Sequence, residues 1–347
     1  MEKKKILHVL FSSTYSGAEN VACTIIKNLG NDFDMLYCCP SGPIEKILKE
    51  RNIKYITMKK LNYFELKKIV ELYNPDIIDA HDYRATLFAS MFSKKCSVIS
   101  HVHVNNPLMD KKSIYSFLFN YIFKRVKKII WVSESAYDNY YYKNNVINKS
   151  KVIYNIIDSN FINEKSNDYI NEKNHDLIFL GRLSTQKNPE RLIEIIELLK
   201  KKKSNISVAI VGDGVKKIIL ENLIKEKGLE DNITMYGFKN NPYPILKSSK
   251  ILIMTSDWEG TPMVALEAQA LGKPIVSTPV DGMKKVISQG VNGFLSNDNN
   301  EIVDDVLYIL DKNNYKKIQK GVIDMFKKSN DSEKYFENIK NIYNASL

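Results

Sequence analysis

Four charged side chains in the second half of the chain have the types and spacing of a site for a phosphorylated ligand. Arg182 and Lys187 lie five residues apart, directly ahead of a helix that is expected to begin near Pro189. Arginine offers a forked donor and lysine a mobile point charge, so together they can hold a diphosphate and neutralise it as it leaves. Glu259 and Glu267 lie eight residues apart around another predicted helix start and can accept hydrogen bonds from hydroxyl groups. The alternatives are a solvated surface pair for Arg182 and Lys187, and a helix-start carboxylate with a solvated helical one for Glu259 and Glu267.

The stretch 251–278 predicts the elements that position the two carboxylates. Residues 251–254 read as a buried strand, Thr261 and Pro262 as a helix cap followed by proline at the first helical position, and Met263 to Leu271 as the helix. A second buried strand follows at 274–278. In a parallel sheet this order places Glu259 and the backbone of residues 260–263 at the carboxyl edge, where such sheets bind ligands.

Two loops with glycine follow other predicted strands. Gly17 opens a helix after the strand 5–11, and Gly212 and Gly214 follow the strand 208–211. Neither loop has the full dinucleotide fingerprint, because the first has one glycine and Lys217 replaces the third glycine of the second. Each glycine allows a phosphate, base or ribose to approach the backbone, or simply makes a turn.

Strands and helices alternate along the whole chain of 347 residues, which is long enough for two domains. The pattern predicts two similar parallel α/β halves. We expect a first domain over 1–165, a polar linker over 166–175 and a second domain over 176–328. The terminal helix 329–347 is free to pack back on the first domain.

Histidines end two of the predicted strands in the first half. His81 follows the strand 76–80, and His103 ends the strand 97–102 on the expected ligand edge. His103 is the better functional candidate, although either histidine could cap a helix or satisfy a loop. The sequence lacks clustered histidine and cysteine ligands, so no metal is expected. The four cysteines are read as small buried side chains in a reducing compartment.

Basic charge is concentrated in the first half. The net charge is +11, and the first 165 residues carry 25 basic and 16 acidic side chains. Residues 111–128 combine an aromatic block with six basic side chains and are too short to span a bilayer. This segment is predicted to lie on an anionic membrane surface, with a buried helix that has a solvated basic end as the alternative. With no signal-like start, we expect a cytoplasmic protein, peripheral at the inner face of the membrane. No platform for nucleic acid is evident.

Taken together, Gly181-Arg182-Leu183 with Lys187, the Glu259 and Glu267 pair, the 16–19 SGAE turn and His103 resemble the retaining glycosyltransferases of family 4. The resemblance covers essentially the whole chain and is strongest over 177–296. It implies the GT-B architecture, an α/β fold of two doubly wound, Rossmann-like parallel-sheet domains that face an interdomain cleft. It also implies transfer of a sugar from a nucleotide donor with retention of configuration and without a metal.

Carried onto this sequence, the resemblance implies that Arg182 and Lys187 bind the donor diphosphate, that Glu259 faces the sugar hydroxyls and that Glu267 binds the ribose. His103 would contact the transferred sugar from the other domain. The implied catalytic residues are His103, Glu259, Arg182 and Lys187. The implied donor-binding residues are Gly17, Gly181, Arg182, Lys187, Gly212, Gly214, Glu259, Gly260, Thr261, Pro262, Met263 and Glu267. The chain departs from the family at Ile156, where relatives often have glycine, and at Lys285, where they often have glutamate.

The resemblance further implies a UDP-sugar as donor and a saccharide or lipid-linked saccharide as acceptor, in bacterial-type capsule, exopolysaccharide or lipopolysaccharide synthesis. The nucleotide sugar is a co-substrate, and no cofactor is expected. Two alternatives stay open at this point: a nucleotide-sugar epimerase on the same scaffold, and a non-catalytic module that binds a sugar nucleotide. Asp32 and Asp34 have the form of a metal-binding motif but precede a strand, so they are read as a solvated turn.

Overall fold

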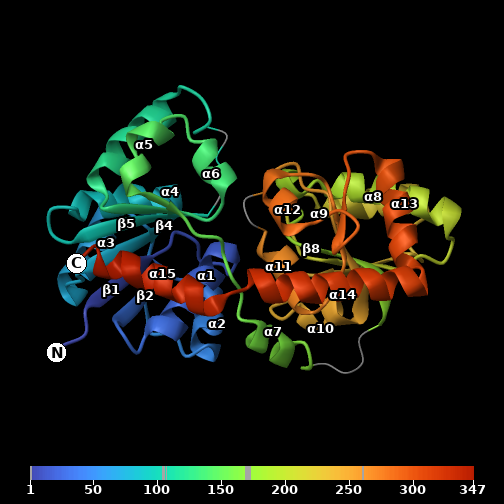
Figure 1. Ribbon diagram of the computed structural model, residues 1–347, viewed down its shortest axis with the longest axis horizontal. Helices are drawn as coiled ribbons and strands as arrows, with labels where there is room; N and C mark the ends of the chain where they lie inside the picture. The colour runs from blue at the N-terminus through green and yellow to red at the C-terminus, as the bar shows by residue number, and fades with distance from the viewer. Residues whose placement is uncertain (1, 104–105, 107, 169–172, 260–261) are drawn as a thin grey trace. The chain divides into compact units, whose positions relative to one another are not determined.

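A computed structural model describes residues 2–103, 106, 108–168, 173–259 and 262–347. The chain divides into two compact units (Figure 1). The first unit contains residues 1–156 and 331–347, and the second contains residues 157–330.

The first unit is built on a 7-stranded parallel sheet with strand order β3-β2-β1-β4-β5-β6-β7. Its strands are β1 (Lys5–Val9), β2 (Asp34–Pro40), β3 (Tyr55–Met58), β4 (Ile77–His81), β5 (Ser97–Val102), β6 (Lys128–Trp131) and β7 (Ser150–Val152). Its α-helices are α1 (Gly17–Leu29), α2 (Ile44–Glu50), α3 (Tyr63–Tyr73), α4 (Asp82–Ala89), α5 (Ile114–Arg125), α6 (Glu134–Asp138) and the terminal α15 (Ser332–Asn344). The strand order reverses between β1 and β4, as in doubly wound folds.

The second unit repeats this plan on a 6-stranded parallel sheet with strand order β10-β9-β8-β11-β12-β13. Its strands are β8 (His175–Leu180), β9 (Val208–Val211), β10 (Ile233–Gly237), β11 (Ser249–Met254), β12 (Ile275–Ser277) and β13 (Gly293–Leu295). Its α-helices are α7 (Ser159–Lys165), α8 (Pro189–Lys202), α9 (Lys217–Glu226), α10 (Tyr243–Ser248), α11 (Met263–Ala270), α12 (Asp281–Val286), α13 (Asn299–Leu310) and α14 (Lys312–Ser329). Two apolar clusters cover the opposite faces of this sheet.

The chain enters the second unit earlier than the sequence predicted. Residues 157–165 were predicted to belong to the first domain, but they lie in the second unit, where α7 packs on α10 and α11. The reason is apolar burial, because Ile157 and Ile162 join the cluster around Tyr243 and Leu266. The Asn330 side chain bonds both the backbone N–H and the carbonyl of Ile157, at 3.0 and 3.1 Å. The two points where the chain passes between units are therefore fastened to each other.

The terminal helix α15 belongs to the first unit, where it packs on α1 (Figure 1). The Tyr343 hydroxyl donates a hydrogen bond to Asp79 Oδ2 of β4 at 2.7 Å, and Ser97 donates to the carbonyl of Ser346. Both Tyr343 and Asp79 are fully buried. Tyr343 and Ser346 thus form polar contacts with the central strands β4 and β5 of the first unit.

The two faces of the first sheet differ in polarity. Alternate residues of β1, β4 and β5, such as Leu7, Ala80 and Val102, join an apolar cluster with α4 and α5. The residues between them on the other face include histidines and an aspartate, which are described below. In the described part of the chain, no helix has the length and hydropathy needed to cross a membrane.

Candidate functional site

The second unit brings Lys187 and Glu259 into direct contact. Lys187 Nζ donates to Glu259 Oε1 at 2.5 Å, and Ser256 Oγ donates to the same oxygen at 2.8 Å. The two charged side chains are only 15% and 8% exposed. Although they lie 72 residues apart in sequence, the sheet order places β8 beside β11, so the loops that follow both strands meet at the carboxyl edge. The sequence had predicted that both residues lie at one ligand site, and the geometry brings them together.

Further hydrogen bonds fasten these two loops to each other. Thr255 Oγ1 donates to the carbonyls of Lys187 and Asn188 at 3.0 and 2.9 Å. Asn188 Nδ2 donates to Asp257 Oδ1 at 3.0 Å, and the amide of Gln186 donates to the carbonyl of Trp258 at 2.9 Å. Asn188 also caps α8, whose first residue is Pro189 as predicted. The Lys187 ammonium is therefore held on a rigid loop rather than on a free side chain.

Arg182 lies in the same loop as Lys187 and has an exposed side chain. Its guanidinium makes no hydrogen bond or ion pair with any other residue that the structure describes. None of the described residues therefore occupies these donors, and an anion in solution can bind them. Charge of this kind close to a paired lysine suits a ligand that carries more than one negative charge.

Gly212 and Gly214 are required by the close packing of the backbone at the carboxyl edge of the second sheet. Gly212 has φ +146, and a Cβ there would lie 1.8 Å from the carbonyl oxygen of Gly181. A Cβ at Gly214 would lie 2.4 Å from the carbonyl oxygen of Leu183. The loops after β8 and β9 pack backbone to backbone, so these glycines are required whether or not a ligand approaches them. Their assignment to donor binding stays a prediction.

The region around the start of α11 is described only in part. The predicted residues Gly260 and Thr261 lie outside the described residues. Pro262 is the N-cap of α11 rather than its first helical residue, and Met263 begins the helix. Glu267 lies within α11 and accepts a hydrogen bond from the Tyr243 hydroxyl at 3.2 Å. Its role at the ribose stays a prediction.

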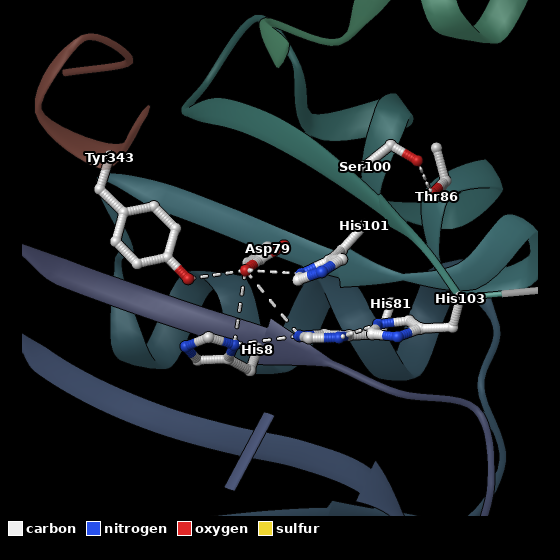
Figure 2. Close-up of polar contacts among 8 residues, drawn as sticks. All are labelled: His8, Asp79, His81, Thr86, Ser100, His101, His103 and Tyr343. Carbon is white, nitrogen blue, oxygen red and sulfur yellow. Dashed lines mark hydrogen bonds and ion pairs between the residues drawn. The ribbon is translucent and has the colours of Figure 1, made fainter. Parts of the chain in front are cut away.

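His103 lies in the first unit at the end of a chain of buried histidines (Figure 2). His81 Nδ1 lies 2.8 Å from His103 Nε2, and His8 Nδ1 lies 3.1 Å from His81 Nε2. Asp79 Oδ2 lies 3.7 Å from His8 Nδ1 and 3.9 Å from both His81 Nε2 and His101 Nδ1. The sequence had indicated no clustered histidines, but register pairs β1 with β4 and β4 with β5, which gathers them on one face.

Burial sets the charges in this histidine cluster. Burial raises the pKa of the Asp79 carboxyl, but His81, His101 and His8 outweigh it, so the pKa lies well below its ordinary value. Burial lowers the pKa of His8 to about 4, against the attraction of Asp79. It also lowers the pKa of His103 well below the ordinary range, with His101 and His81 acting in the same direction. His103 is therefore a neutral imidazole at physiological pH.

Asp82 and the SGAE turn flank this cluster. Asp82 Oδ1 accepts a hydrogen bond from the backbone N–H of His103 at 2.8 Å, and burial raises the pKa of Asp82 to about 7. Asp82 itself has φ +69, a left-handed conformation that is strained for a non-glycine residue. Gly17 begins α1 as predicted, and Ser16 Oγ donates to the buried Glu19 at 2.5 Å.

Sequence reasoning missed most of the histidine cluster. His8, Asp79, His101 and Tyr343 received no role. One signal was available, because polar residues lie two positions apart at the ends of two apolar strands, Asp79 with His81 in β4 and His101 with His103 at the end of β5. That spacing puts them on one face of a sheet. Tyr343 had no comparable signal, since it reaches the cluster from the other end of the chain.

Comparison with known proteins identifies the class. Residues 15–161 match the family model "Glycosyltransferase Family 4", and residues 160–341, just over half of the chain, match "Glycosyl transferases group 1". The chain therefore belongs to family 4 of the glycosyltransferases, and it is a glycosyltransferase. Its two doubly wound sheets form the GT-B fold, as the sequence predicted.

Individual relatives agree with this assignment. The chain is 26% identical over 295 residues to the capsular polysaccharide biosynthesis glycosyltransferase CapH of Staphylococcus aureus, covering 80% of this chain and 81% of the relative. It is 25% identical over 354 residues to the O-antigen biosynthesis glycosyltransferase WclY of Escherichia coli, covering 98% of both. Among solved structures, HepE of Anabaena in complex with UDP-glucose is similar with a TM-score of 0.84 at 20% identity, over 98% of this chain and 99% of that one.

We expect the stability of the first unit to fall on acidification through His8. An unfolded histidine takes up a proton near pH 6.5, whereas folded His8 does so only near pH 4. Its contribution to stability is therefore present above pH 6.5 and is lost as the pH falls toward 4. Between pH 7 and pH 5 this lowers the free energy of unfolding by about 2 kcal/mol. Urea unfolding followed by the fluorescence of the buried Trp131 measures the change.

The groups that face His8 are Asp79, His81, His101 and the ring of Tyr343. A His8→Asn variant keeps a polar group of similar size but cannot titrate. It should lose about 2 kcal/mol less than the wild type between pH 7 and pH 5. Equal losses in both proteins would contradict the assignment of this pH dependence to His8.

Proposed function

We propose that this glycosyltransferase moves a sugar from a UDP-sugar to a saccharide or lipid-linked saccharide acceptor, with retention of configuration and without a catalytic metal. The polymer would be a surface polysaccharide such as a capsule, an exopolysaccharide or a lipopolysaccharide. Supporting this are relatives named for capsule and O-antigen synthesis and one named as a transferase onto a diphospho-undecaprenol-linked sugar. HepE, whose fold is similar, binds UDP-glucose.

The contact between Lys187 and Glu259 carries the donor part of this proposal. Glycosyl transfer develops negative charge on the departing phosphate and positive charge at the anomeric carbon. A fixed ammonium at the carboxyl edge of a parallel sheet suits the first, and a carboxylate beside it suits the sugar hydroxyls. Arg182, with no protein partner among the described residues, would supply further charge to the diphosphate.

The state of Glu259 argues against a covalent glycosyl-enzyme. Its Oε1 already accepts hydrogen bonds from the Lys187 ammonium and the Ser256 hydroxyl. A carboxylate oxygen held in this way is a weak nucleophile, because both bonds stabilise its charge. We therefore favour attack by the acceptor on the face from which the nucleotide leaves. In this scheme His103 would contact the transferred sugar.

The segment 111–128 supports a membrane contact. In α5, Ile114, Phe117 and Tyr121 are 87%, 66% and 60% exposed. Lys111 and Lys112 precede this helix, and Lys124, Arg125, Lys127 and Lys128 lie at its end. Apolar and aromatic side chains next to lysines suit the interface of an anionic membrane. This contact would hold the enzyme at the cytoplasmic face, where it meets lipid-linked acceptors.

A donor panel tests the assigned reaction. We expect the correct UDP-sugar at 100 times its dissociation constant to stabilise the protein by about 2.7 kcal/mol, seen as a rise in Tm. With acceptor present, proton NMR of the product should show the anomeric configuration of the donor, and EDTA should leave the rate unchanged. An epimerase would instead convert donor without acceptor, and a binding module would raise Tm without any turnover. Inverted product would refute the retaining mechanism.

Replacing Lys187 tests the donor site. We expect Lys187→Ala to lower kcat/KM at least 100-fold, because a fixed donor that stabilises a developing anion is worth about 3 kcal/mol. Lys227→Ala is the matched control, since Lys227 forms a similar 2.6 Å pair with Glu197 in the same unit, 30 residues apart in sequence. Steady-state kinetics should show the control within threefold of the wild type. Equal effects of the two changes would mean that Lys187 acts only on stability.

Vesicle binding tests the membrane contact. We expect a variant with serine at Ile114, Phe117 and Tyr121 to bind vesicles of phosphatidylglycerol and phosphatidylcholine at least tenfold more weakly, as a loss of about 0.5 kcal/mol at each position suffices. The control carries serine at Phe64 and Leu72 of α3, which are 74% and 76% exposed. Glutamine at Lys124, Arg125, Lys127 and Lys128 should abolish the preference for anionic lipid. Unchanged co-sedimentation of either α5 variant would refute the contact.

A further inference from the structure

The histidine cluster of the first unit contains an unbroken line of ring contacts that ends at His103. The line runs from His8 to His81 at 3.1 Å and from His81 to His103 at 2.8 Å (Figure 2). Each ring lies on a different strand or strand end, on β1, at the end of β4 and directly after β5. His8 and His81 are at most 1% exposed, and His103 is 7% exposed. The line thus leads from the core of the unit to the edge of its sheet.

Ring orientation favours hydrogen bonding over metal binding in this cluster. Ligand atoms of His81, His101 and His103, and of His8, Asp79 and His81, lie within 4.8 Å of one another. A single metal ion must lie close to the plane of every imidazole that binds it. The ring of His101 is instead stacked on the rings of His81 and His103, with centroids 5.0 and 4.4 Å apart. The rings of His81 and His103 lie edge to edge, with planes 15° apart and facing nitrogens 2.8 Å apart, which leaves no room for an ion between them.

We propose that His81 is a positioning residue that holds His103 in the Nδ1–H form, so that this N–H donates a hydrogen bond to an oxygen of the transferred sugar. The inference rests on the proposed function for the sugar contact. The tautomer of His103 is inferred from contacts within the first unit alone. A histidine that uses one nitrogen inside the protein has the proton on its other nitrogen fixed by that bond.

The protons can be arranged along the line of histidines in two ways, which differ in the nitrogen that is left with an N–H and no partner. If the protons run toward His103, His81 Nδ1–H donates to His103 Nε2, and the unpaired donor is His103 Nδ1–H. If they run the other way, the unpaired donor is His8 Nε2–H. Both atoms are buried and have no partner among the described residues. His8 is 0% exposed and no described residue accepts a hydrogen bond from an N–H there, whereas His103 is 7% exposed at the sheet edge, where a ligand oxygen can accept one.

Asp79 and Asp82 hold the two ends of the line in place. Asp79 Oδ2 lies 3.7 Å from His8 Nδ1 and 3.9 Å from His81 Nε2, so the carboxylate faces the proton that these two nitrogens share in either arrangement. Tyr343 donates to the same carboxylate oxygen at 2.7 Å, and Asp82 holds the backbone N–H of His103 at 2.8 Å. His103 is thus fixed through its main chain and through Nε2, and only Nδ1 is left for a substrate.

Two amide substitutions at His81 distinguish the loss of its hydrogen bond to His103 from the loss of its ring volume. An asparagine amide occupies the place of Nδ1 and can still donate to His103, whereas a glutamine amide occupies the place of Nε2 and reaches only His8. We expect His81→Gln to lower kcat about 100-fold, as for loss of a preorganised donor, and His81→Asn to remain within tenfold of the wild type. The affinity for free UDP, which the second unit would bind, should be unchanged in both. Equal losses of kcat in the two variants would overturn the proposal.

Nitrogen-15 NMR of histidine-labelled protein reads the ring form without any turnover. We expect wild-type His103 to stay neutral from pH 5 to 8 with its proton on Nδ1, to keep this form in His81→Asn and to lose it in His81→Gln. A proton on Nε2 in the wild type, or one stoichiometric metal ion bound to the ring nitrogens, would overturn the proposal. If no sugar is transferred, the proposed function fails, while these spectra still decide the ring form.

Ser100→Ala is the matched control. Thr86 and Ser100 form a buried 2.7 Å hydrogen bond between α4 and β5, beside the cluster but outside the line of histidines (Figure 2). Removing the Ser100 hydroxyl disturbs β5 and leaves the bond from Thr86 to the carbonyl of Asp82 in place. The control should keep kcat within threefold and the same His103 spectrum. A loss of kcat in this control as large as that in His81→Gln would show that any damage near β5 has the same effect, and would overturn the proposal.

Discussion

The contact between Lys187 and Glu259 is the interaction on which the second unit is organised. It joins two loops that belong to different strands, and it exists because β8 and β11 are neighbours in a parallel sheet. Burying an ammonium and a carboxylate costs free energy unless they pair and are bonded further. Here Ser256 adds a bond to the carboxylate, and the bonds from Thr255 and Asn188 hold the two loops together. The loops are thereby rigid before any ligand binds, which is the condition for electrostatic catalysis.

The first unit differs from the second in that it buries polar side chains on one face of its sheet. Its apolar face packs on α4 and α5, and the other face buries four histidines and Asp79 under the terminal helix. Unpaired groups at such a place are costly, so their presence calls for a reason beyond stability. A line of rings that ends at a neutral histidine gives one, because that histidine must offer the same nitrogen at every turnover.

Much of the fold was predictable from the sequence, because apolar runs of strand length alternate with helical segments throughout. The meeting of Lys187 with Glu259 was also predictable in outline, since both follow buried strands of one sheet. Register is what the sequence could not supply. The pairing of His8 with Asp79 and of His81 with His101 depends on which strands are neighbours and how they are aligned. The early start of the second unit was missed because α7 is short and largely polar, and few apolar residues, Ile157, Phe161 and Ile162, join the cluster of that unit.

The position of α15 has a consequence for biosynthesis. The first unit is encoded in two pieces, separated by the 174 residues from Ile157 to Asn330. At 5–20 residues per second, a ribosome needs roughly ten to thirty seconds to translate that insert. During this time the nascent amino-terminal sheet lacks the helix that covers its polar face and the phenol that binds its buried carboxylate. Its hydrophobic collapse can begin early, but its maturation must wait until α15 has been translated, so the sheet stays incomplete throughout that interval.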